Sequence, residues 1–320
     1  YALAAGLVAG KLLGLVEIQP DRTFYALHLE QWGRVFLTGR VISVVFAVLS
    51  VVVMAVLLRR LYPDRGRWLP VLGAAFLAVA PGHVAWSHYL SQNPLVTFWV
   101  LLAFVFLVAL VEKPTVHNSL LAGLFSGVAF STNYNALPLL LLLPLAHLLA
   151  WWPIRQADGL PRKIGRLALS GVAAVVGFVA VTPYAVLDFP TFWAWVTWVN
   201  RNLAGDVGLL ESARRLLLDV LPSTLGWGPY LLGLTGLVWT VANPRRRRAE
   251  WLIPAFVLLF TLMGSRSGHR LAVGRLLPMA VLLLVPAAGV LGAIGDRGTQ
   301  GHGATETRGR GDTETRRKWG

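Results

Sequence analysis

The sequence predicts an all-α fold, a polytopic transmembrane helical bundle, from three observations. The chain has 320 residues, of which 56% are hydrophobic and 14% are charged, and its mean hydropathy is +0.62. Several uncharged apolar runs approach about 20 residues, the length of a helix that crosses a bilayer. The basic residues lie mostly in short loops and in the C-terminal tail. A soluble domain could not cover so many apolar runs, whereas a bilayer covers each of them.

Composition also excludes some classes of function. The chain has no cysteine, so neither a disulfide framework nor thiolate chemistry is available to it. A net charge of +14 could indicate nucleic acid binding. However, Lys and Arg in short loops are typical of a membrane protein oriented by cytoplasmic positive charge. We therefore expect membrane lipids, and no nucleic acid, among its partners.

The chain begins with an apolar stretch, Tyr1–Val16, which contains Lys11 and is too short to span a bilayer comfortably. We expect a helix lying at the membrane interface, with a single span as the alternative. Glu17–Phe36 is polar and aromatic, so an extramembrane connection is expected there. About nine spans follow: Leu37–Leu58, Trp68–Trp86, Leu95–Val111, Ser119–Ser131, Ala136–Trp152, Leu167–Thr182, Gly226–Ala242, Trp251–Met263 and Leu276–Ala293.

The loops between these runs alternate in composition. One set is short and strongly basic: Arg59–Arg67, Lys113, Arg155–Arg166, Arg245–Arg248 and the C-terminal tail. The other set is polar and aromatic: Glu17–Phe36, His83–Asn93, Asn133–Asn135, Pro183–Leu221 and Ser265–Arg275. Basic loops stay in the cytoplasm, so the polar and aromatic residues should converge on the extracytoplasmic face.

The C-terminal segment differs from the rest of the chain. Residues 295–320 are rich in Gly, Thr and Arg, a composition that cannot bury a core. We expect a disordered basic cytoplasmic tail here, after a membrane-embedded domain formed by residues 1–294.

The polar turn Ala80–Pro94 interrupts two apolar runs and is the first candidate for a site. It contains His83, His88, Tyr89 and Asn93, and polar groups near a bilayer usually face a cavity, a partner or water. An ordinary interfacial loop, where Trp and Tyr collect, is the alternative. The two histidines are five residues apart, which is not the i, i+4 spacing of a helical metal pair. We expect no structural metal and leave a catalytic divalent cation open.

Five motifs together resemble one family. They are Gly39–Ser43 with Leu57–Tyr62, Ala80–Phe98, Ala122–Ala129 with Thr132–Asn135, Gly177–Phe192, and Arg275–Pro278. In this order and spacing they resemble the GT-C glycosyltransferases that use polyprenyl-phosphate sugars. The closest group is the bacterial and archaeal relatives of dolichyl-phosphate-mannose:protein mannosyltransferase and of the aminoarabinose transferases. The resemblance extends over residues 1–291.

The resemblance implies a GT-C-like fold and sugar transfer from a polyprenyl-phosphate donor to an unidentified acceptor. The site would face the extracytoplasmic side of the plasma membrane, and no cofactor is expected. In the family an aspartate in the first external loop activates the acceptor. That loop would lie N-terminal of Tyr1, so we expect an N-terminally truncated member whose catalytic residue lies outside this sequence. The candidate substrate-binding residues are His83, His88, Tyr89, Asn93, Asn133, Tyr134, Tyr184 and Asp188.

The leaving phosphate needs cationic partners. Arg266, His269, Arg270 and Arg275 form such a cluster before the last span; contact with lipid headgroups is the alternative for these residues. Asp188 could face the cavity, although a capping role at the following helix is favoured.

Two departures from the family pattern keep other functions open. Asn93 stands where many members carry an aspartate, and Asn133 where many carry a lysine; a neutral amide can neither act as a base nor neutralise phosphate. A non-catalytic subunit of a membrane complex would fit both. A transporter or flippase for a lipid-linked substrate would share the helices and the cavity, but it should show paired repeats or broken helices.

Overall fold

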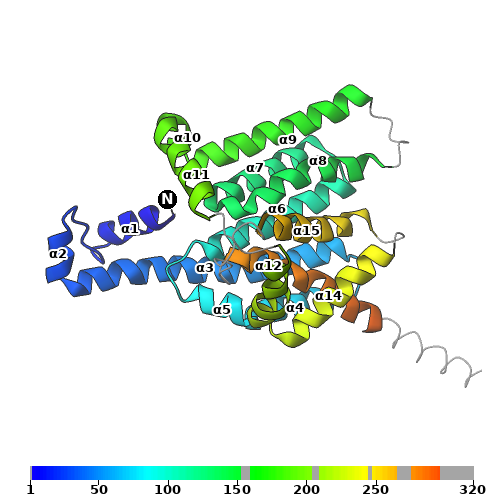
Figure 1. The fold of residues 1–320 in the computed structure, drawn as a ribbon, viewed down its shortest axis with the longest axis horizontal. Helices are drawn as coiled ribbons and strands as arrows, with labels where there is room; N and C mark the ends of the chain where they lie inside the picture. Colours follow the sequence, from blue (N-terminus) through cyan, green and yellow to red (C-terminus); the bar gives the residue numbers. More distant parts are fainter. Residues whose placement is uncertain (1, 153–158, 204–208, 244–246, 265–274, 296–320) are drawn as a thin grey trace, which may run out of the picture.

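The computed structural model describes residues 2–152, 159–203, 209–243, 247–264 and 275–295, and within these ranges the regular elements are helical (Figure 1). The elements are α1 (Ala2–Leu12), α2 (Arg22–Leu27), α3 (Leu29–Leu61), α4 (Trp68–Val79), α5 (Pro81–Ser87), α6 (Asn93–Glu112), α7 (Val116–Thr132), η1 (Tyr134–Ala136), α8 (Leu137–Trp151), α9 (Leu160–Val181), α10 (Tyr184–Leu187), α11 (Phe189–Leu203), α12 (Leu209–Arg215), η2 (Leu216–Val220), α13 (Leu221–Leu225), α14 (Trp227–Ala242), η3 (Arg248–Trp251), α15 (Leu252–Gly264) and a last helix, Arg275–Gly295. The all-α membrane bundle predicted from the sequence is confirmed.

Each of the predicted spans corresponds to helical structure. Five helices are long and apolar enough to cross a membrane: Leu29–Leu61, Asn93–Glu112, Tyr134–Trp151, Leu160–Val181 and Arg275–Gly295. A sixth candidate is the bent pair α4 and α5. The others, α7, α14 and α15, have 17, 16 and 13 residues, so the number of spans stays a prediction.

Three predicted boundaries are wrong. Residues 160–166, predicted as part of a basic loop, form the start of α9, because Pro161 is tolerated in the first turn of a helix. The other two also have local physical reasons. Leu29–Phe36 belongs to α3 rather than to a connection, because no proline lies between His28 and Tyr62 and Trp32 packs edge-on against Phe36. The 33 residues of α3 make a helix about 50 Å long, longer than a bilayer core. The run Trp68–Trp86 is not straight: α4 and α5 meet at 60°, where Pro81 has no N–H to continue the helix.

The predicted N-terminal helix forms as α1. Its 11 residues are too few to span a bilayer. A Cβ on Gly6 would lie 2.7 Å from Ile42 of α3, so the two helices approach closely. Arg34 of α3 donates to the Leu15 carbonyl at 3.1 Å and ties the turn after α1 to α3.

The bundle is layered around α6, which packs against both α3 and α7. In Figure 1, α7, α8 and α9 lie on one side of α6, and α3, α4, α5 and α14 on the other. The spans Asn93–Glu112 and Arg275–Gly295 are the most enclosed, with 72% and 83% of their apolar windows buried. These two helices therefore form the core, whereas α3 and α9 leave rows of apolar residues exposed for lipid.

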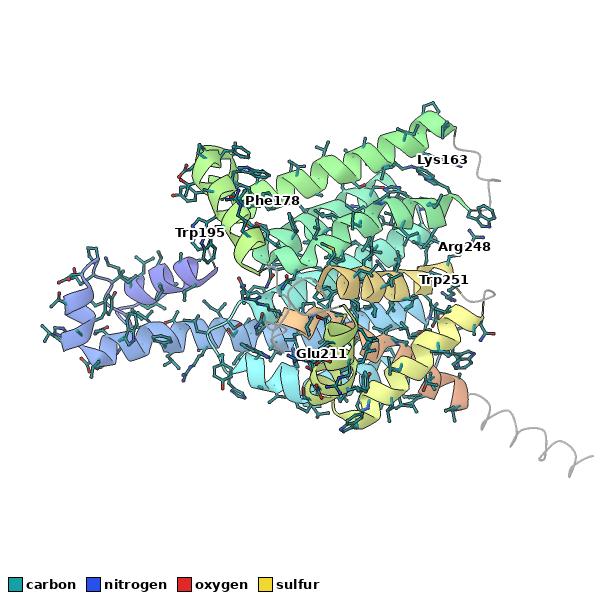
Figure 2. The ribbon with its side chains drawn as sticks, viewed as in Figure 1. Lys163, Phe178, Trp195, Glu211, Arg248 and Trp251 are labelled. Atoms are coloured by element: carbon teal, nitrogen blue, oxygen red, sulfur yellow. The ribbon has the colours of Figure 1, made fainter. Side chains whose placement is uncertain are left out.

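The two ends of the bundle differ in chemistry, as the alternation of loops predicts. At one end Arg247 makes ion pairs with Asp64 and with Glu112, the latter at 3.4 Å. Lys163, Arg248 and Trp251 lie toward this end in Figure 2, whereas Phe178 and Trp195 lie toward the other. Loops far apart in sequence thus share an end. The predicted tail lies outside the described residues, apart from Gly295.

The closest helix contact joins α7 to α9 through small residues. A Cβ on Gly123 would lie 2.0 Å from the carbonyl oxygen of Ser170, and one on Gly127 would lie 2.0 Å from that of Ala174. From the other helix, a Cβ on Gly177 would lie 2.3 Å from the Leu124 carbonyl. Two glycines four residues apart are the usual means of bringing membrane helices into backbone contact.

This contact predicts opposite effects for two Gly-to-Ala changes. Gly127→Ala should lower stability by about 1–3 kcal/mol, because the methyl group meets backbone that cannot move aside. Gly171→Ala on α9, where a Cβ meets nothing within 4 Å, should raise stability by up to about 1 kcal/mol. SDS-induced unfolding in mixed micelles measures both. Equal effects of the two substitutions would contradict the close α7–α9 contact.

Candidate functional site

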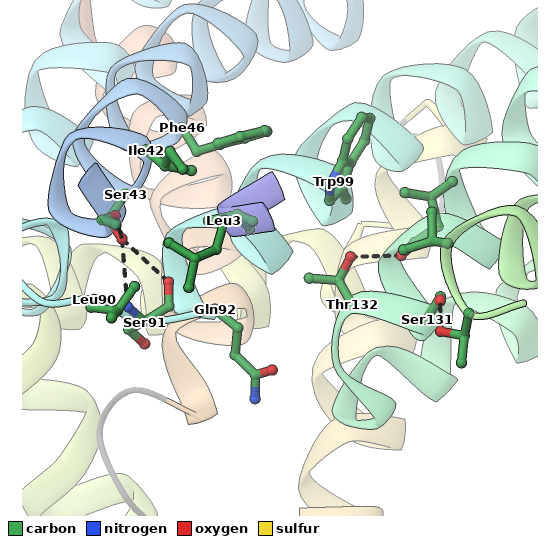
Figure 3. Close-up of a pocket in the computed structure, with 15 residues that line it drawn as sticks. Leu3, Ile42, Ser43, Phe46, Leu90, Ser91, Gln92, Trp99, Ser131 and Thr132 are labelled. Atoms are coloured by element: carbon green, nitrogen blue, oxygen red, sulfur yellow. Dashed lines mark hydrogen bonds between the residues drawn. The ribbon is translucent and has the colours of Figure 1, made fainter. Parts of the chain in front are cut away.

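A cavity of about 510 Å³ lies between α1, α3, α6, α7, α9 and the turn before α6 (Figure 3). Its volume is within the range of small-molecule sites, about 300–1,000 Å³. It is lined by Leu3, Gly39, Ile42, Ser43, Phe46, Leu90, Ser91, Gln92, Leu95, Trp99, Val128, Ser131, Thr132, Val181 and Thr182. Leu90–Gln92 of the lining belong to a loop predicted to be extracytoplasmic, and Thr132 and Thr182 directly precede two others. The cavity therefore lies at the end of the bundle where these loops begin.

One wall is formed where the turn Leu90–Gln92 lies against α3. A Cβ on Gly39 would come within 2.1 Å of a Leu90 methyl group, so the glycine leaves room for the Leu90 side chain against α3. Buried Ser43 completes the contact: its hydroxyl donates to the Ser91 carbonyl at 3.3 Å and accepts from the Ser91 N–H at 3.5 Å. Figure 3 shows both bonds. The cavity wall is therefore held by neutral hydrogen bonds.

The opposite wall is formed by the ends of α7 and α9. Ser131 of α7 and Thr182, at the end of α9, share a hydrogen bond between their hydroxyls. Thr132 donates to the Val128 carbonyl of its own helix at 2.8 Å. These hydroxyls keep acceptor capacity for a bound group, although their protons are largely committed to the protein.

Two lining residues keep free polar groups. Among the described residues, no hydrogen bond partner is found for the side chain of Gln92 or for the indole of Trp99. Trp99 stacks on Phe125 with ring centroids 5.9 Å apart and also contacts Phe46. It is therefore a rigid aromatic surface on the cavity wall, while Gln92 supplies both a donor and an acceptor (Figure 3).

The four candidate residues of the polar turn Ala80–Pro94 fall into two groups, two buried and two exposed. His83 is buried at 3% exposure, and its Nε2 bonds to the Ala47 carbonyl of α3 at 3.2 Å. It therefore holds α5 against α3. Asn93 is also buried, and its backbone bonds to Ser91 and Thr97. His88 and Tyr89 are exposed beside the turn. None of these four lines the cavity, and their substrate-binding roles stay predictions.

The other predicted substrate residues surround the α7 and α9 ends. The Asn133 side chain accepts from the Asn135 N–H at 3.0 Å and so begins η1. Tyr134 contacts Phe130 and Phe192, and Tyr184 is 64% exposed. Asp188 accepts from the Thr191 N–H at 3.3 Å, which is the helix cap that the sequence favoured. The structure brings Asn133 and Tyr134 next to the cavity lining at Thr132.

The predicted phosphate cluster is only partly described. Arg275 begins the last helix and is half-buried, whereas Arg266, His269 and Arg270 lie outside the described residues. Within the described ranges no three His, Cys, Asp or Glu residues gather in a group that could hold a metal ion.

Sequence reasoning found the neighbours of the lining residues but not the residues themselves. Gln92 precedes Asn93, Thr132 precedes Asn133, and Thr182 precedes Pro183–Tyr184. Each of the three stands at a helix boundary, and hydropathy locates such a boundary only to within a few residues. The sequence signal that could have found these three residues is a polar side chain directly beside each predicted turn. Ser43 and Trp99 lie inside apolar runs and gave no such signal.

These features define a polytopic helical membrane protein whose cavity lies at the end opposite the basic loops. The family model for dolichyl-phosphate-mannose-protein mannosyltransferase matches residues 24–184, half of the 320-residue chain. The matched segment includes every lining residue of the cavity except Leu3. The chain belongs to this family, and the resemblance drawn from the motifs is confirmed.

Solved structures share the fold at low sequence identity. ArnT from Cupriavidus metallidurans bound to undecaprenyl phosphate gives a TM-score of 0.60 at 18% identity, covering 82% of this chain and 47% of that one. The apo form gives 0.57 at 17% identity, with 79% and 45% covered. The Archaeoglobus fulgidus oligosaccharyltransferase in complex with Zn and sulfate gives 0.50 at 14%, with 92% and 40% covered. The chain thus spans about half the length of these proteins or less, and the likeness shows a GT-C fold. No curated protein matches the chain by sequence.

The hydrogen bond across the cavity rim predicts energetic coupling between α7 and α9. Ser131→Ala and Thr182→Val should each cost about 1 kcal/mol of stability, and the double variant should cost less than their sum by about 0.5–1 kcal/mol. Thr235→Val removes a hydroxyl that bonds within α14 and should be additive with Ser131→Ala. Unfolding in mixed micelles measures the cycle, and strict additivity of Ser131→Ala with Thr182→Val would exclude the bond.

Proposed function

We propose that this chain is part of an integral-membrane glycosyltransferase of the plasma membrane, which moves a sugar from a polyprenyl-phosphate donor to an acceptor at the extracytoplasmic face. The observation that carries the proposal is the cavity: the family-matched segments meet there, at the end opposite the basic loops. Similar solved folds support the donor class, since ArnT was solved with undecaprenyl phosphate and the archaeal oligosaccharyltransferase AglB with dolichol-phosphate and an inhibitory peptide.

The transfer needs a base, a leaving group and a sugar site. The acceptor oxygen forms a bond to the anomeric carbon, the bond from that carbon to the phosphate oxygen breaks, and polyprenyl phosphate leaves with the electron pair. The acceptor proton passes to a carboxylate, which the family resemblance places N-terminal of Tyr1. Arg275, with Arg266, His269 and Arg270, would stabilise the departing phosphate.

The described cavity fits the uncharged part of this reaction. Its fifteen lining residues include no ionisable side chain, so the phosphate would be held elsewhere, in keeping with the proposed arginine cluster. Gln92 can donate to and accept from a sugar hydroxyl, and the Trp99 ring offers an apolar face with one N–H. Both groups would orient the sugar rather than react with it.

Two other functions make different predictions for the same protein. A lipid-linked-substrate transporter gains some support from the broken helix at Pro81; it would move the donor across the bilayer without consuming it. A non-catalytic subunit would bind the donor and do neither. Donor consumption, donor translocation and donor binding therefore separate the three functions.

Full-length protein should transfer sugar from a polyprenyl-phosphate donor in detergent. Gln92→Ala should lower kcat/KM by about 10-fold, the effect of one neutral hydrogen bond of about 1.4 kcal/mol. Asn243→Ala, which removes an amide at the far end of α14, is the matched control and should leave kcat/KM unchanged. If transfer is insensitive to Gln92→Ala, the cavity takes no part in the mechanism. If no donor supports transfer, the enzymatic function is excluded.

The absence of cysteine makes the proposed orientation directly testable. His88 and Lys113 flank α6 and are both exposed. In intact cells His88→Cys should react with a membrane-impermeant maleimide, and Lys113→Cys should react only after the cells are opened. The reverse pattern would place the cavity on the cytoplasmic side.

A further inference from the structure

Helix α11 (Phe189–Leu203) carries more exposed aromatic surface than its packing explains. Phe192 points into the bundle, where it contacts Tyr134 and Phe178. Phe189 and Trp193 remain 54% exposed each, and their rings stack on one another with centroids 6.0 Å apart. On the other flank Trp195 is 61% exposed. The described bundle therefore covers only part of the aromatic surface of α11.

The spacing of these residues is that of an amphipathic helix. Phe189, Phe192, Trp193 and Val196 stand at i, i+3, i+4 and i+7, which places them on one face. Thr191 and Ala194 lie on a different side of the helix and are exposed. The pattern assigns one side of α11 to an apolar environment and another to water.

The position of α11 identifies that environment. The chain leaves α9, where Val172, Val175 and Val176 are more than half exposed, and enters α11 through α10, where Val186 and Leu187 are 63% and 76% exposed. Figure 1 shows α11 turning across the direction in which α3 and α9 run. Its 15 residues make about 22 Å, too short to cross a bilayer. The apolar surface is thus continuous along the chain with the lipid-facing side of a span.

The chemistry of α11 also matches the headgroup layer. Trp and Phe rings collect where hydrocarbon meets water, and Trp can keep its N–H in the wet region. The last turn of α11 carries Arg201, and its first turn carries no acid; a cation at this depth can reach lipid phosphates.

We propose that α11 lies in the headgroup layer of the bilayer, with Phe189 and Trp193 directed to the acyl chains and Ala194 to water. The helix would then act on the cavity through Phe192. That ring touches Tyr134 and Phe178, which stand beside Thr132 and Thr182 of the cavity rim. Lipid contact would hold the rim in place, so the bilayer surface becomes one of the supports of the site.

The test uses single cysteines at three positions, because the 320-residue sequence has no cysteine of its own. Phe189→Cys, Trp193→Cys and the control Ala194→Cys are each spin-labelled and reconstituted in vesicles of phosphatidylethanolamine and phosphatidylglycerol. Collisions of the label with oxygen, which concentrates in lipid, are compared with collisions with a water-soluble nickel chelate. The oxygen-to-nickel ratio at positions 189 and 193 should exceed that at 194 several-fold.

Two results would overturn the proposal. An equal ratio at the three positions would place α11 in water. Exclusion of both reagents from positions 189 and 193 would show that protein, a partner subunit or a second copy, covers the face. Each variant loses one aromatic ring, and this loss could itself release α11 from the membrane. Phe189→Cys keeps Trp193, so disagreement between the labels at positions 189 and 193 would reveal such a release. The measurement involves no substrate and is independent of the proposed transferase activity.

Discussion

The cavity depends above all on the backbone contact between α7 and α9. Within a bilayer there is little hydrophobic gain when two helices associate, so close packing must supply the attraction. Gly123 and Gly127 on one helix and Gly177 on the other remove the side chains that would separate the two backbones. Because the contact runs along both helices toward the cavity end, it sets the position of Ser131 against Thr182. A small-residue packing pattern thereby determines the shape of a polar site about one to two turns away.

The second wall follows the same principle with different groups. Gly39 lets Leu90 approach α3, and buried Ser43 then binds the backbone of the turn. Most hydroxyls around the cavity are engaged with the protein in this way. Among the residues that line the cavity, only Gln92 and Trp99 have side-chain polar groups for which the described chain offers no hydrogen-bond partner. Hydroxyl groups that bond within the protein therefore fix the cavity walls, and the polar groups of Gln92 and Trp99 are left to contact a ligand.

Hydropathy predicted which segments are helical, because an apolar run in a membrane protein must satisfy its own backbone as a helix. It failed at Leu29–Phe36, where polar residues continue α3 beyond the apolar run, and at Pro81, where an apolar run bends. The sequence predicted the turns that border the cavity but not the residues that line it. Turn residues such as Asn133 and Asp188 use their side chains to begin the next helix. Ser43 and Trp99 could not be found, because their role arises from contacts between segments distant in sequence.

The two ends of the bundle are held together by different forces, and this difference bears on how the site can change. At the basic end Arg247 pairs with Asp64 and Glu112 on exposed surface, where each pair contributes about 1 kcal/mol or less and is screened by salt. At the cavity end neutral hydrogen bonds and aromatic contacts hold the helices together, and neither kind of contact responds strongly to salt or to pH near neutrality. Orientation in the membrane can therefore be set by charge at one end without disturbing the geometry of the other. Substitutions that alter the ligand preference of the cavity should accordingly be found at Gln92, whose side chain makes no hydrogen bond within the described chain.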